Sequence, residues 1–318
     1  MKETNYVVGV DIGGTTTKIG IVDRRGEIVA QTVITSKYGP EESEKFMDSV
    51  CKAITDLATV IGMDQIRGVG IGAPNANYYT GVIAFAPNLT WARKGSVPLR
   101  DYISKKLNLP VTITNDANAA AMGEMTYGNA RGMKNFIMIT LGTGVGSGIV
   151  INGEVVYGHD GFAGELGHTC AVRHNGRICG CGKSGCLETY ASATGVARSA
   201  REWLDSGKYN DSLLANLDEI TSKDVYDAAV QGDQLALDVF QFTGTILGRQ
   251  FADFVAFSAP EAIVMFGGLA RSGDFIFKPT KEAMEANLLP MWRDKVQIIP
   301  SALKESDAAI LGASALAW

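Results

Sequence analysis

Two segments of this 318-residue chain share one pattern, in which an apolar strand runs into a glycine-rich turn and a second strand follows. In the first, residues 6–10 precede DIGGTTTK and residues 19–22 follow it. In the second, residues 136–141 precede GTGVGSG and residues 149–151 follow it. Each segment predicts a β-hairpin whose tip exposes backbone N–H groups and hydroxyls, which suits a phosphate group. An ordinary turn is the alternative for either hairpin alone, but the repetition favours a duplicated core.

The rest of the chain alternates strand and helix patterns, which predicts an α/β fold. Apolar residues recur at helical spacing in 41–61, 189–204, 222–231, 234–257 and 307–317, and short β-branched runs predict strands at 28–35, 69–71, 111–114, 262–266 and 296–299. With 46% hydrophobic residues, a chain of this length supports a sizeable core and two domains.

Four side chains in one stretch form a candidate metal site. Cys179, Cys181 and Cys186 have the spacing C-x-C-x4-C, and His168 precedes them. Three thiolates and one imidazole are the ligand set of a closed, structural zinc site. Ordinary buried thiols are the alternative, and Cys170 and His174 are the spare candidate ligands. The lone Cys51, in a helical pattern, is expected in the core.

Other polar residues stand at the ends of predicted strands. Asp11 ends the first strand, where it could hold Mg²⁺ through waters. Asp116 lies at the start of a helix, where its carboxylate is stabilised, with helix capping as the alternative role. Asn88 lies in a proline-marked loop and offers a donor and an acceptor to vicinal hydroxyls, although asparagine is also a common turn former. The Gly267-Gly268 turn after a strand would let a nucleoside lie close to the backbone.

Composition narrows the classes of function. The net charge of −5 argues against a nucleic-acid partner, because such proteins concentrate positive charge. The N-terminal residues lack a signal-peptide pattern and no apolar run reaches about 18 residues, so no membrane association is expected. Cysteines clustered around glycines suit a reducing compartment, which predicts a cytoplasmic protein.

The metal-site stretch resembles the signature of the ROK family (repressors, open reading frames, sugar kinases), in which E-x-G-H is followed by CxCGxxGCxE. Here that signature begins at Glu165 and ends at Glu188. DIGGTTTK, the Asn115-Asp116 turn and LGTGVGSG extend the resemblance along the chain. It implies an actin-like, ribonuclease-H-like ATPase fold with two domains around an interdomain cleft. The small domain would take residues 1–118 and 305–318, and the large domain residues 119–304.

The resemblance also implies an ATP-dependent hexose kinase that phosphorylates glucose at its 6-hydroxyl, with ATP, Mg²⁺ and a structural Zn²⁺. Asp116 would be the general base. The sugar-binding residues would be Asn88, Asn115, Asp116, Glu165, His168 and Glu188. The nucleotide-binding residues would be Asp11, Gly13, Gly14, Thr15, Lys18, Gly142, Thr143, Gly144, Gly267 and Gly268. The metal ligands would be His168, Cys179, Cys181 and Cys186.

Three alternatives to a glucose kinase stay open. An N-acetylglucosamine or N-acetylmannosamine kinase would use the same residues, because nothing in the sequence defines what fills the space at the sugar's second carbon. A sugar-sensing transcription regulator is disfavoured, since the first ATPase strand is expected near Tyr6 with no DNA-binding segment before it. A filament-forming scaffold would not need the sugar-binding carboxylates. The resemblance suggests a homodimer or homotetramer.

Overall fold

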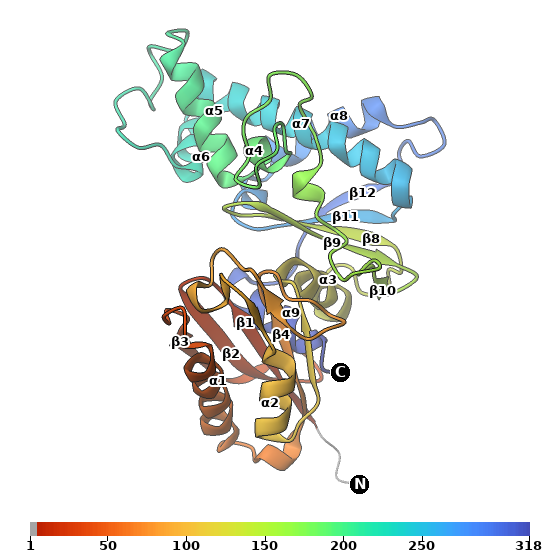
Figure 1. The fold of residues 1–318 in the computed structure, drawn as a ribbon. Helices are drawn as coiled ribbons and strands as arrows, with labels where there is room; N and C mark the ends of the chain where they lie inside the picture. The colour runs from red at the N-terminus through yellow and green to blue at the C-terminus, as the bar shows by residue number, and fades with distance from the viewer. Residues whose placement is uncertain (1–4) are drawn as a thin grey trace. The chain divides into compact units, whose positions relative to one another are not determined.

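The computed structural model describes residues 5–318, which form two compact units (Figure 1). Of these residues, the first unit takes those up to Met133, together with Val155–Gly164 and Ala302–Trp318. The second unit consists of Lys134–Glu154 and Glu165–Ser301. The first unit thus includes the helix that begins at Asp116, because this helix packs against the C-terminal helix of the same unit.

A five-stranded sheet with the order β3-β2-β1-β4-β7 forms the centre of the first unit. Its strands are β1 (Tyr6–Ile12), β2 (Thr16–Asp23), β3 (Ile28–Thr35), β4 (Ile66–Gly72) and β7 (Val111–Thr114), and β5 (Ile83–Ala84) pairs with β6 (Ser96–Val97) outside it. β1 and β2 form the first predicted hairpin, and β3 extends it as an antiparallel strand. β4 and β7 add parallel strands on the other side of β1.

Helices cover both faces of this first sheet. They are α1 (Ser43–Ala58), α2 (Leu99–Leu107), α3 (Asp116–Tyr127) and α9 (Glu305–Ala315). Successive side chains of a strand point to opposite faces. Val8 and Val10 of β1 therefore share a core with Phe46 of α1, whereas Val7 packs with Ile310 of α9.

The second unit repeats this arrangement around a sheet with the order β10-β9-β8-β11-β12. Its strands are β8 (Phe136–Leu141), β9 (Val145–Ile151), β10 (Glu154–Val155), β11 (Ala262–Phe266) and β12 (Gln297–Pro300). β8 and β9 form the second predicted hairpin, and β11 and β12 follow in parallel. Each sheet therefore has an antiparallel hairpin on one side and two parallel strands on the other, as a duplicated core requires.

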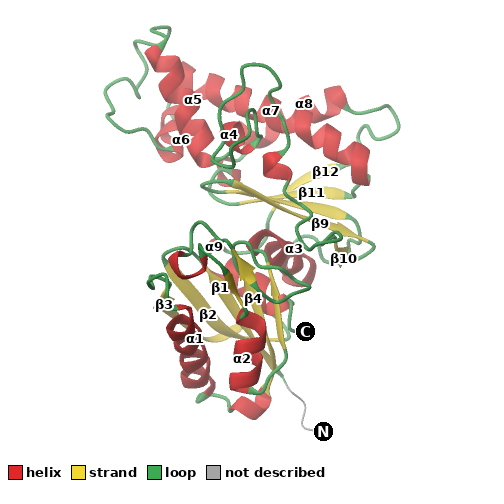
Figure 2. Cartoon of the chain, in the orientation of Figure 1, coloured by secondary structure: helices red, strands yellow, loops and turns green. Residues whose placement is uncertain are grey.

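The remaining helices of the second unit, α4 to α8, lie on one side of its sheet (Figure 2). They are α4 (Glu188–Ala191), α5 (Ala193–Asp205), α6 (Ser222–Val230), α7 (Gln234–Ser258) and α8 (Asp274–Asn287). α7 supplies much of the buried core, including Phe240 and Phe251. Thr221 caps α6 with a capping box.

Three helical features differ from the sequence-based expectation. The single helix expected over 189–204 is wrong: Ser192 is extended and divides it into α4 and α5, because its side chain accepts the N–H of Gly195 and starts a new helix. Helix α2 was not predicted from the sequence. Helix α8, which has Pro279 in its interior, was not predicted either. Packing of α8 against α7 offsets the hydrogen bond that the proline cannot make.

Cys51 is buried in the core of the first unit, as expected. None of the helices formed by residues 5–318 combines the length and the apolar character that crossing a bilayer requires.

Candidate active site and metal centre

The tip of the first hairpin is held by backbone and hydroxyl contacts. The Gly13 N–H donates to the Thr16 carbonyl at 3.0 Å, which closes the turn. The Ser36 N–H donates to the Thr15 carbonyl at 2.9 Å. Below the tip, the buried hydroxyls of Thr17 and Ser36 hydrogen-bond at 2.7 Å. The segment after β3 therefore braces the tip, while Gly14 and Thr15 stay exposed to solvent.

Three charged side chains of the first unit interact at this hairpin. Asp11 of β1 pairs across the ladder with Lys18 of β2. Burial and the negative charge of nearby Asp116 raise the pKa of Asp11 to about 6, although Lys18 partly offsets them. Two carboxylates that repel one another form a site that a divalent cation would stabilise.

Asp116 begins α3 directly after β7. Asn115 is the N-cap, and its side-chain oxygen accepts the N–H of Asn118 at 3.0 Å. One oxygen of Asp116 accepts the N–H of Ala117 at 2.8 Å. Solvent reaches the Asp116 side chain, but the surrounding protein reduces its hydration and raises its pKa. Helix capping thus belongs to Asn115, and Asp116 keeps an oxygen for chemistry.

The loop that carries Asn88 packs against the first hairpin. A Cβ atom placed on Gly14 would lie 3.0 Å from the Asn88 carbonyl oxygen, so the two segments touch. The Arg93 guanidinium donates twice to the Pro87 carbonyl, at 3.1 and 2.8 Å, which stabilises the conformation of the loop itself. The structure therefore brings Asn88, Asn115 and Asp116 to the same unit as the first hairpin.

The tip of the second hairpin is held by the segment around α4 and α5. Gly142 closes the turn by donating its N–H to the Gly144 carbonyl at 3.1 Å. The Ala193 N–H donates to the Gly142 carbonyl at 2.8 Å, and the Thr194 hydroxyl donates to the Thr143 carbonyl at 2.9 Å. These hydrogen bonds satisfy the carbonyl groups of the tip, so its exposed surface presents N–H groups.

Glu188, the first residue of α4, connects this hairpin with the cysteine cluster. One carboxylate oxygen accepts the N–H of Val145 at 3.0 Å, and the other lies 3.8 Å from the Cys179 sulfur. Glu165 and His168 belong to the same unit: Glu165 precedes a 3₁₀ turn, Leu166–His168, and His168 is its last residue. This turn is tied to β9, because the Leu166 N–H donates to the Ser147 hydroxyl at 3.0 Å.

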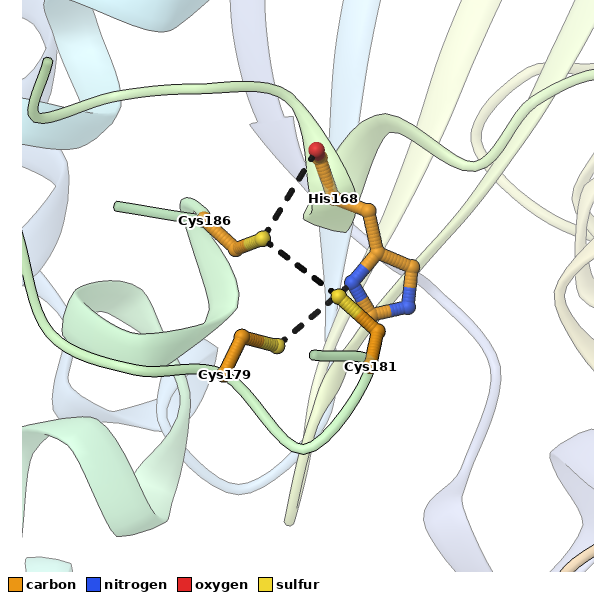
Figure 3. Close-up of side chains that lie close together, drawn as sticks. All are labelled: His168, Cys179, Cys181 and Cys186. Carbon is orange, nitrogen blue, oxygen red and sulfur yellow. Dashed lines mark hydrogen bonds between the residues drawn. The ribbon is translucent and has the colours of Figure 1, made fainter. Parts of the chain in front are cut away.

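The four predicted metal ligands converge on one point (Figure 3). Ligand atoms of His168, Cys179, Cys181 and Cys186 all lie within 4.8 Å of one another. The sulfurs of Cys181 and Cys186 are 3.7 Å apart, and the Cys179 sulfur is 3.7 Å from the His168 Nδ1. A tetrahedral zinc ion with Zn–S bonds of about 2.3 Å separates its sulfur ligands by about 3.8 Å. The donor set and its spacing therefore fit zinc.

The spare candidates do not join this group within the described part of the chain. The Cys170 thiol is exposed and donates to the Val172 carbonyl at 3.6 Å, and His174 is exposed. Within the cluster, burial raises the pKa of Cys186 to about 12, whereas the Lys183 N–H lowers the pKa of Cys181. A bound cation would offset the cost of ionising the buried thiols.

Gly267 and Gly268 follow β11 and begin the turn into a short 3₁₀ helix, Ala270–Ser272. Gly268 lines a cavity of about 500 Å³ in the second unit, together with Lys223 and Tyr226 of α6. Gly267 lies beside it with φ of 104° and packs against the Leu141 backbone.

Arg177 and Thr194 were not predicted from the sequence. The Thr194 hydroxyl contacts the second hairpin. Arg177 begins the segment that carries the three metal-binding cysteines, residues 177–186, which we call the cysteine loop, and it joins this loop to α5. Two signals were present: Arg177 stands two residues before Cys179, and Ser192 with Gly195 marks a helix start at which Thr194 is exposed. Neither pattern predicts which residues distant in the sequence these two side chains contact.

Comparison with known proteins identifies close relatives. A model of the ROK family matches residues 7–318. The glucokinase of Halalkalibacterium halodurans is 40% identical over 314 residues, which is 96% of this chain and 93% of that protein. The glucokinase of Thermotoga maritima is 35% identical over 316 residues, which is 98% of this chain and 96% of that protein.

Two solved structures show how widely this fold is used. The ROK family glucokinase of Streptomyces griseus, solved with glucose and AMPPNP, matches with a TM-score of 0.78 and 33% identity, over 97% of this chain and 98% of that one. A ROK family transcriptional regulator, a homologue of the E. coli MLC protein, matches with a TM-score of 0.87 and 26% identity, over 98% of this chain and 77% of the regulator. The fold therefore does not separate kinase from regulator, and the site residues must do so.

Proposed function

This chain belongs to the ROK family and has its actin-like ATPase fold, and from that premise we propose that it phosphorylates glucose with ATP. The observation that supports this most directly lies within the first unit, where the charge of Asp116 acts on Asp11, a residue in the first strand of a glycine-rich hairpin. A proton acceptor and a cation-binding carboxylate next to a phosphate-binding turn are the parts that phosphoryl transfer to an alcohol needs.

Asp116 is the proposed general base. Its free oxygen would accept the proton of the glucose 6-hydroxyl as that oxygen attacks the γ-phosphate of ATP. Its raised pKa makes it a better proton acceptor than an ordinary carboxylate. Asp11 would hold Mg²⁺ through waters, with Lys18 beside it, and Mg²⁺ supplies charge neutralisation on the phosphates when bound. The exposed N–H groups of the two hairpin tips would bind the phosphates.

The proposed sugar-binding residues come from both units. Asn88 and Asn115 of the first, and Glu165, His168 and Glu188 of the second, would bind the sugar hydroxyls. The His168 Nδ1 faces the sulfurs (Figure 3), so the Nε2 remains for a sugar oxygen. Gly267 and Gly268 would border the adenosine, in keeping with the cavity beside Gly268.

We propose zinc as a structural ion in the cluster of three cysteines and His168. Four protein ligands leave no open coordination position, so the ion would not take part in the reaction. It would instead hold His168 and the loop that leads to Glu188. The proposed partners are the sugar and ATP, with no nucleic acid. We further propose a homodimer or homotetramer in the cytoplasm, where thiols stay reduced.

A coupled assay of ADP formation tests the reaction. Glucose, N-acetylglucosamine, N-acetylmannosamine, mannose and fructose are each supplied with ATP and Mg²⁺, and we expect glucose to give the highest kcat/KM. If an N-acetylhexosamine gives a higher kcat/KM than glucose, that sugar is the preferred substrate and the glucose assignment is wrong. Absence of turnover with every hexose would reject the kinase. Because regulators share the fold, sugar-responsive retardation of DNA in a gel would then favour that alternative.

A further inference from the structure

Arg177 is a buried charged residue beside the cysteines, although it is neither a predicted ligand nor a predicted substrate contact. Its side chain is 8% exposed. The guanidinium donates to the Thr189 carbonyl at 2.8 Å and the Ser199 hydroxyl at 2.9 Å, and it pairs with Glu202 at 2.6 Å. It also lies 4.6 Å from the centre of the Tyr190 ring. A buried guanidinium is costly unless its donors are paired, so this geometry is strongly determined.

The backbone of Arg177 belongs to the cysteine loop itself. Its carbonyl accepts the Gly185 N–H at 2.9 Å, next to Cys186, and its own N–H donates to the Tyr190 hydroxyl at 2.8 Å. Arg177 therefore attaches the loop that carries the cysteines to both α4 and α5.

The N-terminal residues of the same two helices hold the second hairpin. Glu188 accepts the Val145 N–H, Ala193 donates to the Gly142 carbonyl and the Thr194 hydroxyl donates to the Thr143 carbonyl. The Ser192 hydroxyl lies 2.9 Å from that of Thr194, which orients it. All three hairpin contacts come from residues 188–194, and Arg177 binds the carbonyl of Thr189 inside this segment.

We propose that Arg177 and Thr194 are positioning residues for phosphate binding: Arg177 fixes α4 and α5 on the cysteine loop, and Thr194 fixes the hairpin tip on α5. The inference rests on the proposed function, because it takes the second hairpin as the site of the ATP phosphates. It adds that the cysteine loop supports nucleotide binding as well as the sugar carboxylates. Neither residue would touch the reacting atoms.

Binding of AMPPNP with Mg²⁺, measured by calorimetry on the full chain, tests the proposal without requiring turnover. Thr194→Val removes the hydroxyl at nearly constant volume, and we expect the Kd to rise about fivefold, the value of one hydrogen bond. Thr194→Ser keeps the hydroxyl and should restore binding. Arg177→Met should raise the Kd about tenfold, and Arg177→Lys, which keeps the charge but not the fork, should lie between.

Arg198→Met is the matched control. Arg198 is an exposed residue of α5 whose guanidinium lies 2.7 Å from the carboxylate of the same Glu202. It should bind AMPPNP like the unmodified chain. Equal weakening in Arg177→Met and Arg198→Met, or unchanged binding in Thr194→Val, would overturn the proposal. If Arg177→Met does not fold, the Lys and Thr194 variants decide it.

Zinc content is measured in each variant, and we expect it unchanged because the substitutions leave the four ligands intact. Loss of zinc from Arg177→Met would assign Arg177 to the metal site instead and overturn its role here. If the unmodified chain binds AMPPNP but does not phosphorylate glucose, the proposed function is wrong, and the AMPPNP-binding test of Arg177 and Thr194 still applies. Active variants with normal AMPPNP binding would reject only this inference.

Discussion

The Asp116 carboxylate lies close enough to Asp11 for its negative charge to act on the Asp11 proton. Burial and this charge together raise the pKa of Asp11 to about 6, against the partial compensation of Lys18. Reduced hydration within the surrounding protein also raises the pKa of Asp116. Two carboxylates that resist ionisation make both the proposed reaction and the stability of the first unit dependent on pH.

As the pH is lowered, activity should be lost at a higher pH than it would be if the two carboxylates had ordinary pKa values. Asp116 must be ionised to accept a proton, and Asp11 must be ionised to hold Mg²⁺, so kcat/KM should decline as the pH drops below about 6. Bound Mg²⁺ favours the ionised form of Asp11, so higher Mg²⁺ should move this limb to lower pH. A pH–rate profile at two Mg²⁺ concentrations checks this. A limb near pH 4 at both concentrations would contradict it.

Replacing Asp11 by Asn should stabilise the protein at neutral pH. The pKa of Asp11 is about 6 in the folded chain and near 3.8 in the unfolded one, so the folded state binds the proton more tightly. The contribution of Asp11 to wild-type stability is therefore fully present below pH 4 and is lost as the pH rises through 6. Asp11→Asn should raise the free energy of unfolding by about 1–3 kcal/mol at pH 8 and little at pH 4. Urea denaturation at both values measures the change.

Asp56→Asn serves as the control for that experiment. Asp56 is 62% exposed and pairs with Lys52 on the surface of α1. Its replacement should change the free energy of unfolding by less than about 1 kcal/mol at either pH. An equal gain in both variants would show that the Asp11 environment is not responsible.

Asp116→Asn should lower kcat by a factor of about 10² to 10⁴, because the amide cannot accept the hydroxyl proton. Glucose binding, measured by calorimetry, should stay within about twofold, since an amide has nearly the same shape. Asp274→Asn is a matched control at another helix start, in α8. Near-normal turnover by Asp116→Asn would remove its assignment as general base.

Cys186→Ser should lower the zinc content from about one ion per chain toward zero and lower the Tm, because the metal-binding free energy stabilises the folded loop. Cys170→Ser should keep both values, since the exposed Cys170 lies outside the ligand group. Metal analysis and thermal unfolding of the two variants distinguish these cases. A metal-free wild type of unchanged Tm would contradict the structural zinc.

Gly144→Ala should weaken glucose binding with little loss of stability. A Cβ atom on Gly144 would lie 2.3 Å from a Glu188 carboxylate oxygen, so that carboxylate must move away from the Val145 N–H. Its flexible side chain makes this displacement inexpensive for the fold. Gly142→Ala is the control, because a Cβ there would meet no atom within 4 Å. Calorimetry with glucose and no nucleotide should show a higher Kd for Gly144→Ala alone.

Local patterns in the sequence were sufficient for the elements of this protein. Alternating and helical periodicity located the two hairpins, the strands and α1, α6 and α7, because hydrophobic spacing reflects which face is buried. The spacing of Cys179, Cys181 and Cys186 with His168 predicted a group that the fold brings together. Ligands close in sequence need only a short loop to converge, so their proximity was predictable.

Contacts between distant residues were decided by the tertiary structure alone. The break at Ser192, the helix around Pro279 and the bonds from Arg177 to Thr189 and Ser199 depend on which elements pack together. The assignment of Val155–Gly164 to the first unit likewise follows from contacts across the fold. The sequence determined the chemical groups and the turns that expose them. Packing decided which group supports which, because hydrogen bonds between residues far apart in the chain leave no local periodicity.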